Sequence, residues 1–120
     1  MQLQDIKDYI VNNTQDNEYT LVPIYDSKKF FYNKAIVKIY GNIKVLYSYD
    51  TPVCYIYDCC KYTKYFLNYD IQESLLFSNT TLRHIKEFLQ QDISIQLALS
   101  NTIGGKITKN DIIKNDGKEF

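Results

Sequence analysis

The chain has 120 residues, of which 14 are Lys or Arg and 14 are Asp or Glu, so its formal net charge at pH 7 is zero. A chain of this length predicts a single domain over residues 1–120 that buries about two-thirds of its unfolded surface without metals or disulfides. The balanced charge and the single arginine argue against sequence-specific DNA binding, because bidentate readout of bases depends on arginine.

The N-terminal part of the chain predicts a short helix followed by a strand. Residues 3–11 place apolar side chains at helical spacing, and residues 12–18 are polar and predict a loop. Residues 19–24 predict a strand. Pro23 places this strand at a sheet edge, because proline cannot donate to the hydrogen-bond ladder.

The centre of the chain predicts an antiparallel sheet. Two β-branched runs flank Gly41-Asn42, which predicts a two-residue hairpin turn because glycine readily adopts a positive φ. Residues 52–58 and 61–67 predict two further strands of a meander. The register of the hairpin places one apolar set on the face that we expect to form the core: Ala35, Val37, Ile39 and Leu46. The other face mixes a lysine with tyrosines and is expected to be more polar: Ile36, Lys38, Tyr40, Val45 and Tyr47.

The C-terminal half predicts one main helix, over residues 79–91. Residues 68–74 predict a loop before it, and the segment 78–81 offers several hydroxyl or amide N-caps. One stripe of this helix is apolar and is expected to pack on the sheet: Leu82, Ile85, Phe88 and Leu89.

The segment that follows the main helix is ambiguous between two structures. Residues 93–100 alternate apolar side chains, which favours a strand over an extension of the helix. Gly104-Gly105 predicts a turn, since the frame of a phosphate-binding loop is absent around it. Thr108 is expected to cap a short final helix over 109–114, and residues 115–120 form a polar tail.

The only arginine and the only histidine of the chain are adjacent, at Arg83-His84 in the main helix. No motif supplies His84 with a nucleophile or an orienting carboxylate, so we interpret it as packing at the edge of the apolar stripe with one nitrogen in solvent. Arg83 is expected to pair loosely with Glu87, one turn further on. Alternatively, Arg83 binds an anion together with Thr80 and Thr81 near the helix N-terminus.

The other reactive side chains do not predict catalysis or a cofactor. The carboxylates between the predicted elements are isolated from one another: Asp26, Asp50, Asp58, Asp70 and Glu73. Cys54 lies in a predicted strand without a basic neighbour that would lower the pKa of its thiol. The chain has an odd number of cysteines, which predicts reduced thiols in a cytoplasmic protein. It lacks a Cys/His cluster, so we expect no zinc or other metal.

The sequence predicts neither a signal peptide nor a membrane-spanning segment. The N-terminal residues lack the basic and long apolar regions of a signal peptide. No apolar run approaches the roughly 20 residues that cross a bilayer. We therefore expect no membrane partner.

Tyrosine dominates the aromatic residues, with 12 Tyr, 6 Phe and no Trp. The sheet tyrosines cannot all enter one small core, so some are expected to line a protein-contact surface. Bias from an AT-rich genome would also explain part of the excess. Stacking of single-stranded nucleic acid is the least supported alternative, because few lysines lie beside these tyrosines.

Residues 31–56 and 77–91 resemble a family of small uncharacterised proteins encoded by phages, plasmids and conjugative elements of gut bacteria. The family pattern has an F-Y-x-K-A strand, an S-Y-x-T-x-V turn and an S-x-T-T-L-R-H-I-x-E-F-L helix. The matching residues are Phe31, Tyr32, Lys34 and Ala35, then Ser48, Tyr49, Thr51 and Val53, then Ser78, 80–85 and 87–89. The resemblance implies an inhibitor of bacterial defence, such as an anti-CRISPR protein, and carries over no catalytic residue.

These observations predict an α+β fold, with an antiparallel sheet of about four to five strands, the 79–91 helix on one face and short terminal helices. We expect a non-enzymatic protein of the host bacterial cytoplasm that binds a defence protein, such as a Cas effector. The sequence is also compatible with a homodimer. The alternative is a sponge for a nucleotide immune signal, with aromatic rings on the base and phosphate near the start of the main helix. The expected contact residues are Arg83, Thr80, Thr81, Tyr40, Tyr47, Tyr49 and Tyr57.

Overall fold

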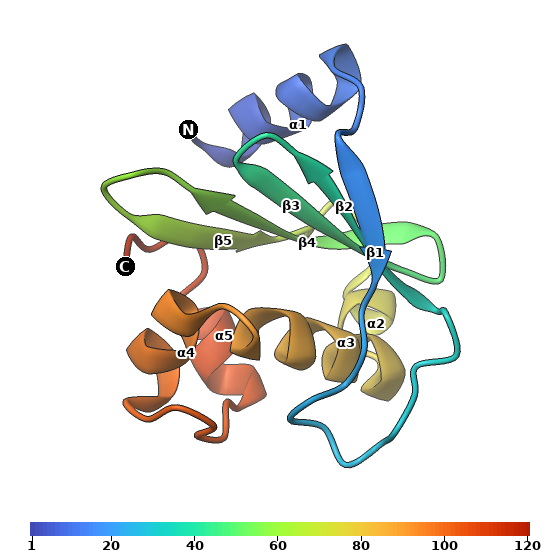
Figure 1. Ribbon diagram of the computed structural model, residues 1–120, viewed down its shortest axis with the longest axis vertical. Helices are drawn as coiled ribbons and strands as arrows, with labels where there is room; N and C mark the ends of the chain where they lie inside the picture. Colours follow the sequence, from blue (N-terminus) through green and yellow to red (C-terminus); the bar gives the residue numbers. More distant parts are fainter.

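A five-stranded antiparallel sheet lies between one helix on one face and four helices on the other (Figure 1). The computed structural model describes residues 1–120. The strands follow one another in the order β1 (Asn17–Thr20), β2 (Ala35–Tyr40), β3 (Ile43–Ser48), β4 (Thr51–Asp58) and β5 (Thr63–Leu67). The helices are α1 (Leu3–Asn12), α2 (Glu73–Leu76), α3 (Asn79–Gln90), α4 (Ile93–Ser100) and α5 (Lys109–Lys114). The predicted α+β fold is confirmed.

The central hairpin has the predicted turn and register. Gly41 adopts φ +57°, and Tyr40 pairs with Ile43 across the turn. A strand was predicted over residues 19–24, whereas β1 covers Asn17–Thr20 and is therefore shorter and starts earlier. As predicted, this strand lies at the edge of the sheet.

Residues 93–100 form helix α4, so the predicted strand is wrong. Asp92 lies two residues after the end of α3 and caps the new helix, because its carboxylate accepts from the Ile95 N–H at 3.1 Å. Asn101 ends the helix in the left-handed conformation, at φ 63°. Alternation over eight residues was therefore a weaker signal than the capping residue beside it. Part of the predicted loop 68–74 is also helical, because α2 starts at Glu73.

The polar tail 115–120 extends the sheet by pairing with β5. Thr63 and Phe120 exchange two backbone hydrogen bonds of 3.0 and 2.9 Å, and the Gly117 N–H donates to the Tyr65 carbonyl at 2.8 Å. The tail thus covers the backbone groups of an edge strand, which would otherwise be open to pairing with another chain.

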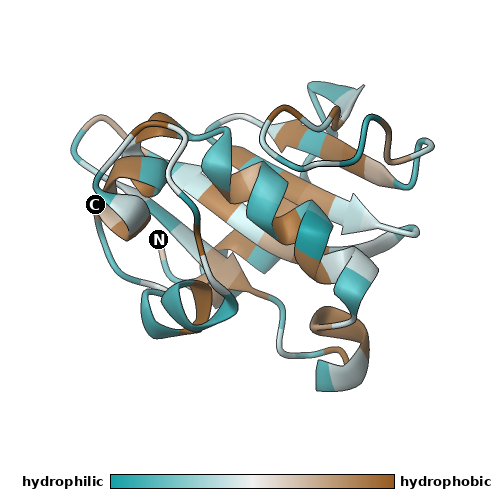
Figure 2. Ribbon diagram, turned by 90° about the horizontal axis from the view of Figure 1, so that it is seen from below, coloured by the Kyte–Doolittle hydropathy of each residue, from teal (hydrophilic) through white to brown (hydrophobic).

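Both faces of the sheet are buried, each by a different hydrophobic cluster. The larger cluster contains the predicted core residues Ala35, Val37 and Leu46 and packs against the four helices below the sheet. Seen from that side, α3 turns hydrophilic residues outward while the strands behind it are hydrophobic (Figure 2). The predicted apolar stripe of α3 accordingly faces inward, with Ile85, Phe88 and Leu89 buried.

The second face, expected to be the more polar one, is covered by α1. Ile6 of α1 is fully buried against Tyr40, Ile43 and Val45. The expectation of a single core face is therefore incomplete, because the predicted N-terminal helix contributes its own apolar side to the sheet.

No helix combines the length and the apolar composition that crossing a membrane requires. The three cysteines are free, and no group of three or more His, Cys, Asp or Glu side chains has a metal-binding arrangement.

Candidate functional site

The connection between β1 and β2 forms an irregular segment over residues 21–34, here called the aromatic loop, that lies beside α3 (Figure 1). Leu21 and Phe31 are buried in the main core and fix the two ends of the loop. The Gln91 side chain donates to the Val22 carbonyl at 2.8 Å. Several large apolar side chains of the loop remain exposed: Val22, Ile24, Phe30 and Tyr32.

Glu87 of α3 holds the middle of the aromatic loop by its backbone. Its Oε1 accepts from the Tyr25 and Asp26 N–H groups, at 2.9 and 2.8 Å. Its Oε2 accepts from the Gln91 side chain at 2.8 Å. Glu87 is only 1% exposed, so its carboxylate replaces water as the partner of buried N–H groups. The predicted pairing of Glu87 with Arg83 is therefore wrong.

Arg83 pairs with Asp26 of the aromatic loop instead. Its Nη1 lies 2.7 Å from Asp26 Oδ1, and Oδ1 also accepts from the Lys28 N–H at 2.9 Å. The arginine side chain remains 41% exposed while that of Asp26 is 14% exposed. The guanidinium is thus fixed in direction and still accessible to a ligand or partner.

His84 packs deeper than predicted. It is buried, its Nδ1 lies 2.8 Å from Ser48 Oγ, and its ring centroid is 4.6 Å from that of Phe31. Burial lowers the pKa of His84 to about 4, so its ring is neutral at physiological pH. Ser48 is itself buried and also lies 3.4 Å from the Thr81 hydroxyl. Thr81 is therefore part of a buried polar group and does not line the neighbouring cavity.

A cavity of about 320 Å³ lies between the aromatic loop, the β3–β4 turn and the start of α3. It brings together three of the predicted contact residues, Tyr49, Thr80 and Arg83. Lys28 and Lys34 also line it, and Lys34 Nζ lies 5.9 Å from the centre of the Tyr49 ring. The cavity wall therefore combines exposed aromatic rings with three cationic side chains.

Two adjacent turns direct aromatic side chains outward at this cavity. Tyr32 and Asn33 have φ of 52° and 60°, and Tyr49 and Asp50 have φ of 51° and 67°. The Tyr49 N–H donates to the Lys34 carbonyl at 2.9 Å and links the two turns. A left-handed backbone is costly for tyrosine, at roughly 1–3 kcal/mol per residue, so the surrounding structure must hold both turns.

The remaining predicted tyrosines do not join this site. Tyr40, Tyr47 and Tyr57 belong to the cluster under α1, where Tyr40 is buried and the other two are half-buried. Burial raises the pKa of the Tyr47 hydroxyl to about 12. The predicted tyrosine surface thus divides into a part covered by α1 and an exposed part around Tyr49.

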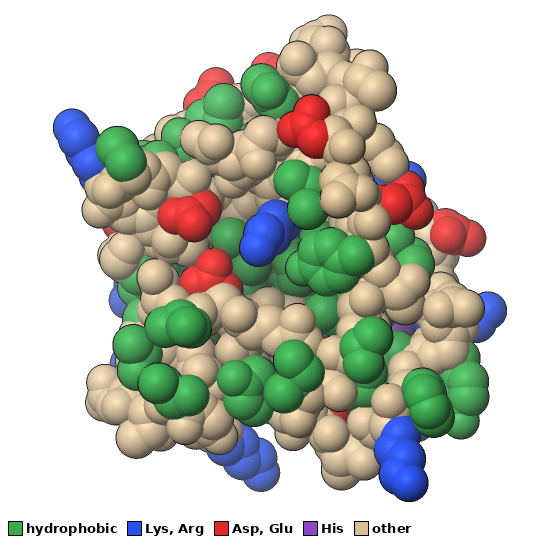
Figure 3. Space-filling model, in the orientation of Figure 1, with side chains coloured by type: hydrophobic (Ala, Val, Ile, Leu, Met, Phe, Trp, Pro, Cys, Tyr) green, Lys and Arg blue, Asp and Glu red, His purple; other side chains and the backbone are tan.

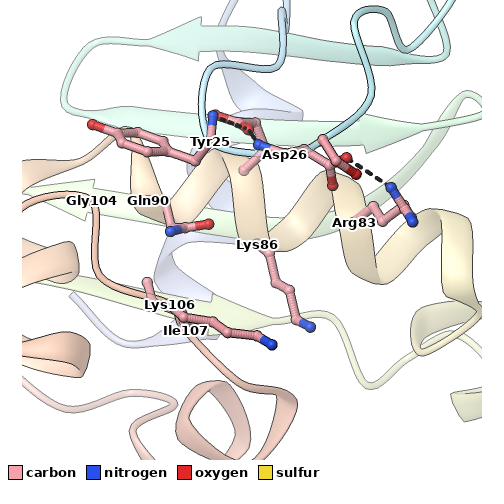
Figure 4. A pocket seen from close by; sticks show the side chains of 10 residues that line it. Tyr25, Asp26, Arg83, Lys86, Gln90, Gly104, Lys106 and Ile107 are labelled. Carbon is pink, nitrogen blue, oxygen red and sulfur yellow. Dashed lines mark hydrogen bonds and ion pairs between the residues drawn. The ribbon is translucent and has the colours of Figure 1, made fainter.

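A second cavity, of about 550 Å³, lies between α3, the aromatic loop and the segment that joins α4 to α5 (Figure 4). Arg83 lines both cavities. Lys86, Gln90 and Lys106 project into the second one. This site could not be predicted from the sequence, because residues 86 and 106 carry no motif and only the fold brings them together.

The contact surface formed by Phe30 and Tyr32 was also not predicted from the sequence. The segment 22–34 has no helical or strand periodicity, and its only signal was the F-Y-x-K-A part of the resemblance. Comparison of the chain with curated proteins and with solved structures gave no match. A comparison with protein families matches residues 19–112, a range that begins within β1, contains β2 to α4 and both cavities, and ends within α5. The chain belongs to a family of unknown function, DUF8033.

Proposed function

We propose that this protein is a non-enzymatic inhibitor of a bacterial defence system that binds a defence protein, such as a CRISPR nuclease, in the host cytoplasm. The observation that carries the proposal is the exposure of three aromatic side chains around one cavity: Phe30 is 63% exposed, Tyr32 76% and Tyr49 54%. Large exposed aromatic side chains that cluster are typical of protein interfaces, where they supply much of the binding energy.

The rest of this surface also favours contact with another macromolecule. On the face seen in Figure 3, hydrophobic side chains gather over the lower half, where the helices and the aromatic loop lie. The anchors from Glu87 and Gln91 fix the loop backbone before any partner binds. A fixed loop loses little conformational entropy on association, which increases affinity.

The nearest approach to a catalytic pair, Ser48 with His84, supports a structural role over an enzymatic one. Ser48 is buried and does not line the cavity beside it, so its hydroxyl has no place for a substrate. The resemblance of residues 30–91 to proteins of phages and conjugative elements supports inhibition of host defence as the purpose of the binding.

The proposal is tested by the activity of purified defence nucleases in the presence of the protein. Inhibition is expected for at least one of them and is expected to be lost when Phe30 and Tyr32 are both replaced by Ala. Val11→Ala is the matched control, because Val11 is an exposed apolar side chain on α1, away from the aromatic loop. Absence of inhibition and of association across the panel, or equal inhibition by the double variant, would overturn the proposal.

The second candidate function, a sponge for a nucleotide immune signal, is favoured by the lining of the 320 Å³ cavity. Tyr49 offers a stacking surface, and Lys28, Lys34 and Arg83 offer positive charge for phosphate. Calorimetric titration with cyclic dinucleotides and ADP-ribose derivatives tests this function. If the protein is such a sponge, at least one of these compounds should bind, and Lys34→Gln should weaken the binding. The absence of binding across the panel would rule out this function.

A further inference from the structure

Two lysines from distant parts of the chain extend into the 550 Å³ cavity. Lys86 comes from α3, and Lys106 comes from the segment between α4 and α5. Figure 4 shows both side chains reaching the same part of the cavity, with their ammonium groups toward one another. We propose that this cavity binds a small phosphate-bearing molecule, with the phosphate between Lys86 and Lys106.

Neither lysine forms an ion pair in the free protein. The two ion pairs of the molecule are Arg83 with Asp26 and Lys7 with Asp70, and neither involves Lys86 or Lys106. Two ammonium groups that share one cavity repel each other at distances shorter than the Debye length of about 8 Å. An anion between them removes this repulsion and gains hydrogen bonds from both.

The carboxylates of the cavity wall do not form ion pairs with the lysines. Asp26 accepts from Arg83 and from the Lys28 N–H, and Glu87 accepts from the Tyr25 and Asp26 N–H groups. Both carboxylates are therefore engaged by other donors.

The segment that carries Lys106 is fixed to α3. The Gln90 side chain donates to the Gly105 carbonyl at 3.0 Å, and Ile107 is buried in the main core. A Cβ atom on Gly105 would lie 2.4 Å from Thr102 Oγ1, so the turn closes only with glycine at this position. The position of Lys106 is thus determined by the fold, which favours a formed site over a flexible surface lysine.

The size and polarity of the cavity indicate the class of ligand. Its volume lies within the range of about 300–1,000 Å³ that is typical of small-molecule sites. Two ammonium donors suit a dianion with several oxygens, and phosphate is the common anion of this kind. The exposed ring of Tyr25 borders the same cavity and offers a surface for a base. Inorganic phosphates and nucleotides share this chemistry, and the experiment separates them.

The test is calorimetric titration of the full chain at low salt with pyrophosphate, AMP and citrate. Pyrophosphate or AMP is expected to bind, and Lys86→Gln and Lys106→Gln are each expected to weaken the binding by about tenfold or more. Tighter binding of AMP than of pyrophosphate would assign a nucleotide, and the reverse would assign an inorganic phosphate. Lys61→Gln removes the same charge from an exposed turn outside both cavities and is expected to have no effect.

Three outcomes would overturn the proposal. They are the absence of binding by both phosphate compounds at millimolar concentration, unchanged binding in the Lys86 and Lys106 variants, and citrate binding as tight as that of pyrophosphate. Binding lost in Lys34→Gln but kept in Lys86→Gln would place the ligand in the other cavity and equally overturn it. The nuclease assay tests the proposed function through Phe30 and Tyr32, whereas the titration tests the phosphate site through Lys86 and Lys106. Failure of one proposal can therefore be distinguished from failure of the other.

Discussion

Arg83 and Asp26 form an ion pair of 2.7 Å that connects α3 to the aromatic loop at the boundary between the two cavities. Glu87, the acidic residue one turn beyond Arg83, points to the loop backbone instead. The helix therefore uses its buried carboxylate to hold the loop and keeps its guanidinium half-exposed beside both cavities.

This ion pair is expected to contribute little to stability. Because Arg83 is 41% exposed, solvent screens the pair, and a double-mutant cycle with Arg83→Gln and Asp26→Asn should give a coupling of at most about 1 kcal/mol. Urea unfolding of the four proteins measures it. A coupling above about 2 kcal/mol would show that the pair is a main structural link.

Glu87, in contrast, is expected to be essential for the loop. Glu87→Ala leaves the Tyr25 and Asp26 N–H groups without their acceptor and should lower the free energy of unfolding by about 2–4 kcal/mol. Glu87→Gln keeps one acceptor oxygen and should cost less. Hydrogen exchange at these two amides reports the loop directly. Glu73→Ala, at an exposed residue, is the control and should leave both measurements unchanged.

His84 is expected to make stability depend on pH in the acidic range. Its pKa is lowered from 6.5 to about 4, so between these values the unfolded chain binds more protons than the folded protein. The His84 contribution, about 3 kcal/mol, is therefore complete above pH 6.5 and is lost as pH falls toward 4. In denaturant titrations from pH 4 to 7, His84→Gln should remove the His84 part of the pH dependence and leave the opposite dependence that Asp116 contributes. An unchanged pH profile in the variant would contradict the assignment to His84.

Asp116 is expected to act in the opposite sense. Burial raises the pKa of its carboxyl from 3.8 to about 6, so the folded protein binds the proton more tightly, and the Asp116 contribution to stability is lost as pH rises through 6. Asp116→Asn keeps an oxygen for the Leu67 N–H and removes the ionisation. The variant should be more stable than the wild type at pH 7, by about 1 kcal/mol after solvent screening, and not below pH 4. Equal destabilisation at both pH values would contradict this expectation.

The parts of the fold that were predicted correctly are those that local chemistry determines. The Gly41 turn fixed the register of the central hairpin, and Ser78 and Thr108 cap α3 and α5 by bonding N–H groups within one turn. The apolar stripe of α3 showed which side faces the sheet. Each of these signals involves residues close in sequence, so no knowledge of the tertiary structure was needed.

The errors in the prediction came from competition between local signals or from distant partners. Residues 93–100 alternate like a strand, but Asp92 supplies a cap that starts a helix. Glu87 was predicted as the partner of Arg83 because it lies one helical turn away in the sequence. The actual partner, Asp26, lies 57 positions away in the aromatic loop.

The sequence by itself determined the class of the fold, the hairpin, the main helix and its inward face, because turns, caps and periodicity act over a few residues. Only the tertiary structure decided that α1 buries the tyrosines of the second face, that Phe30, Tyr32 and Tyr49 meet at one cavity, and that Lys86 and Lys106 share another. Each of these groups contains residues that are far apart in the sequence and that come together only when the loops and helices pack against the sheet. The residues of both candidate sites are therefore neighbours in space that no local pattern identifies.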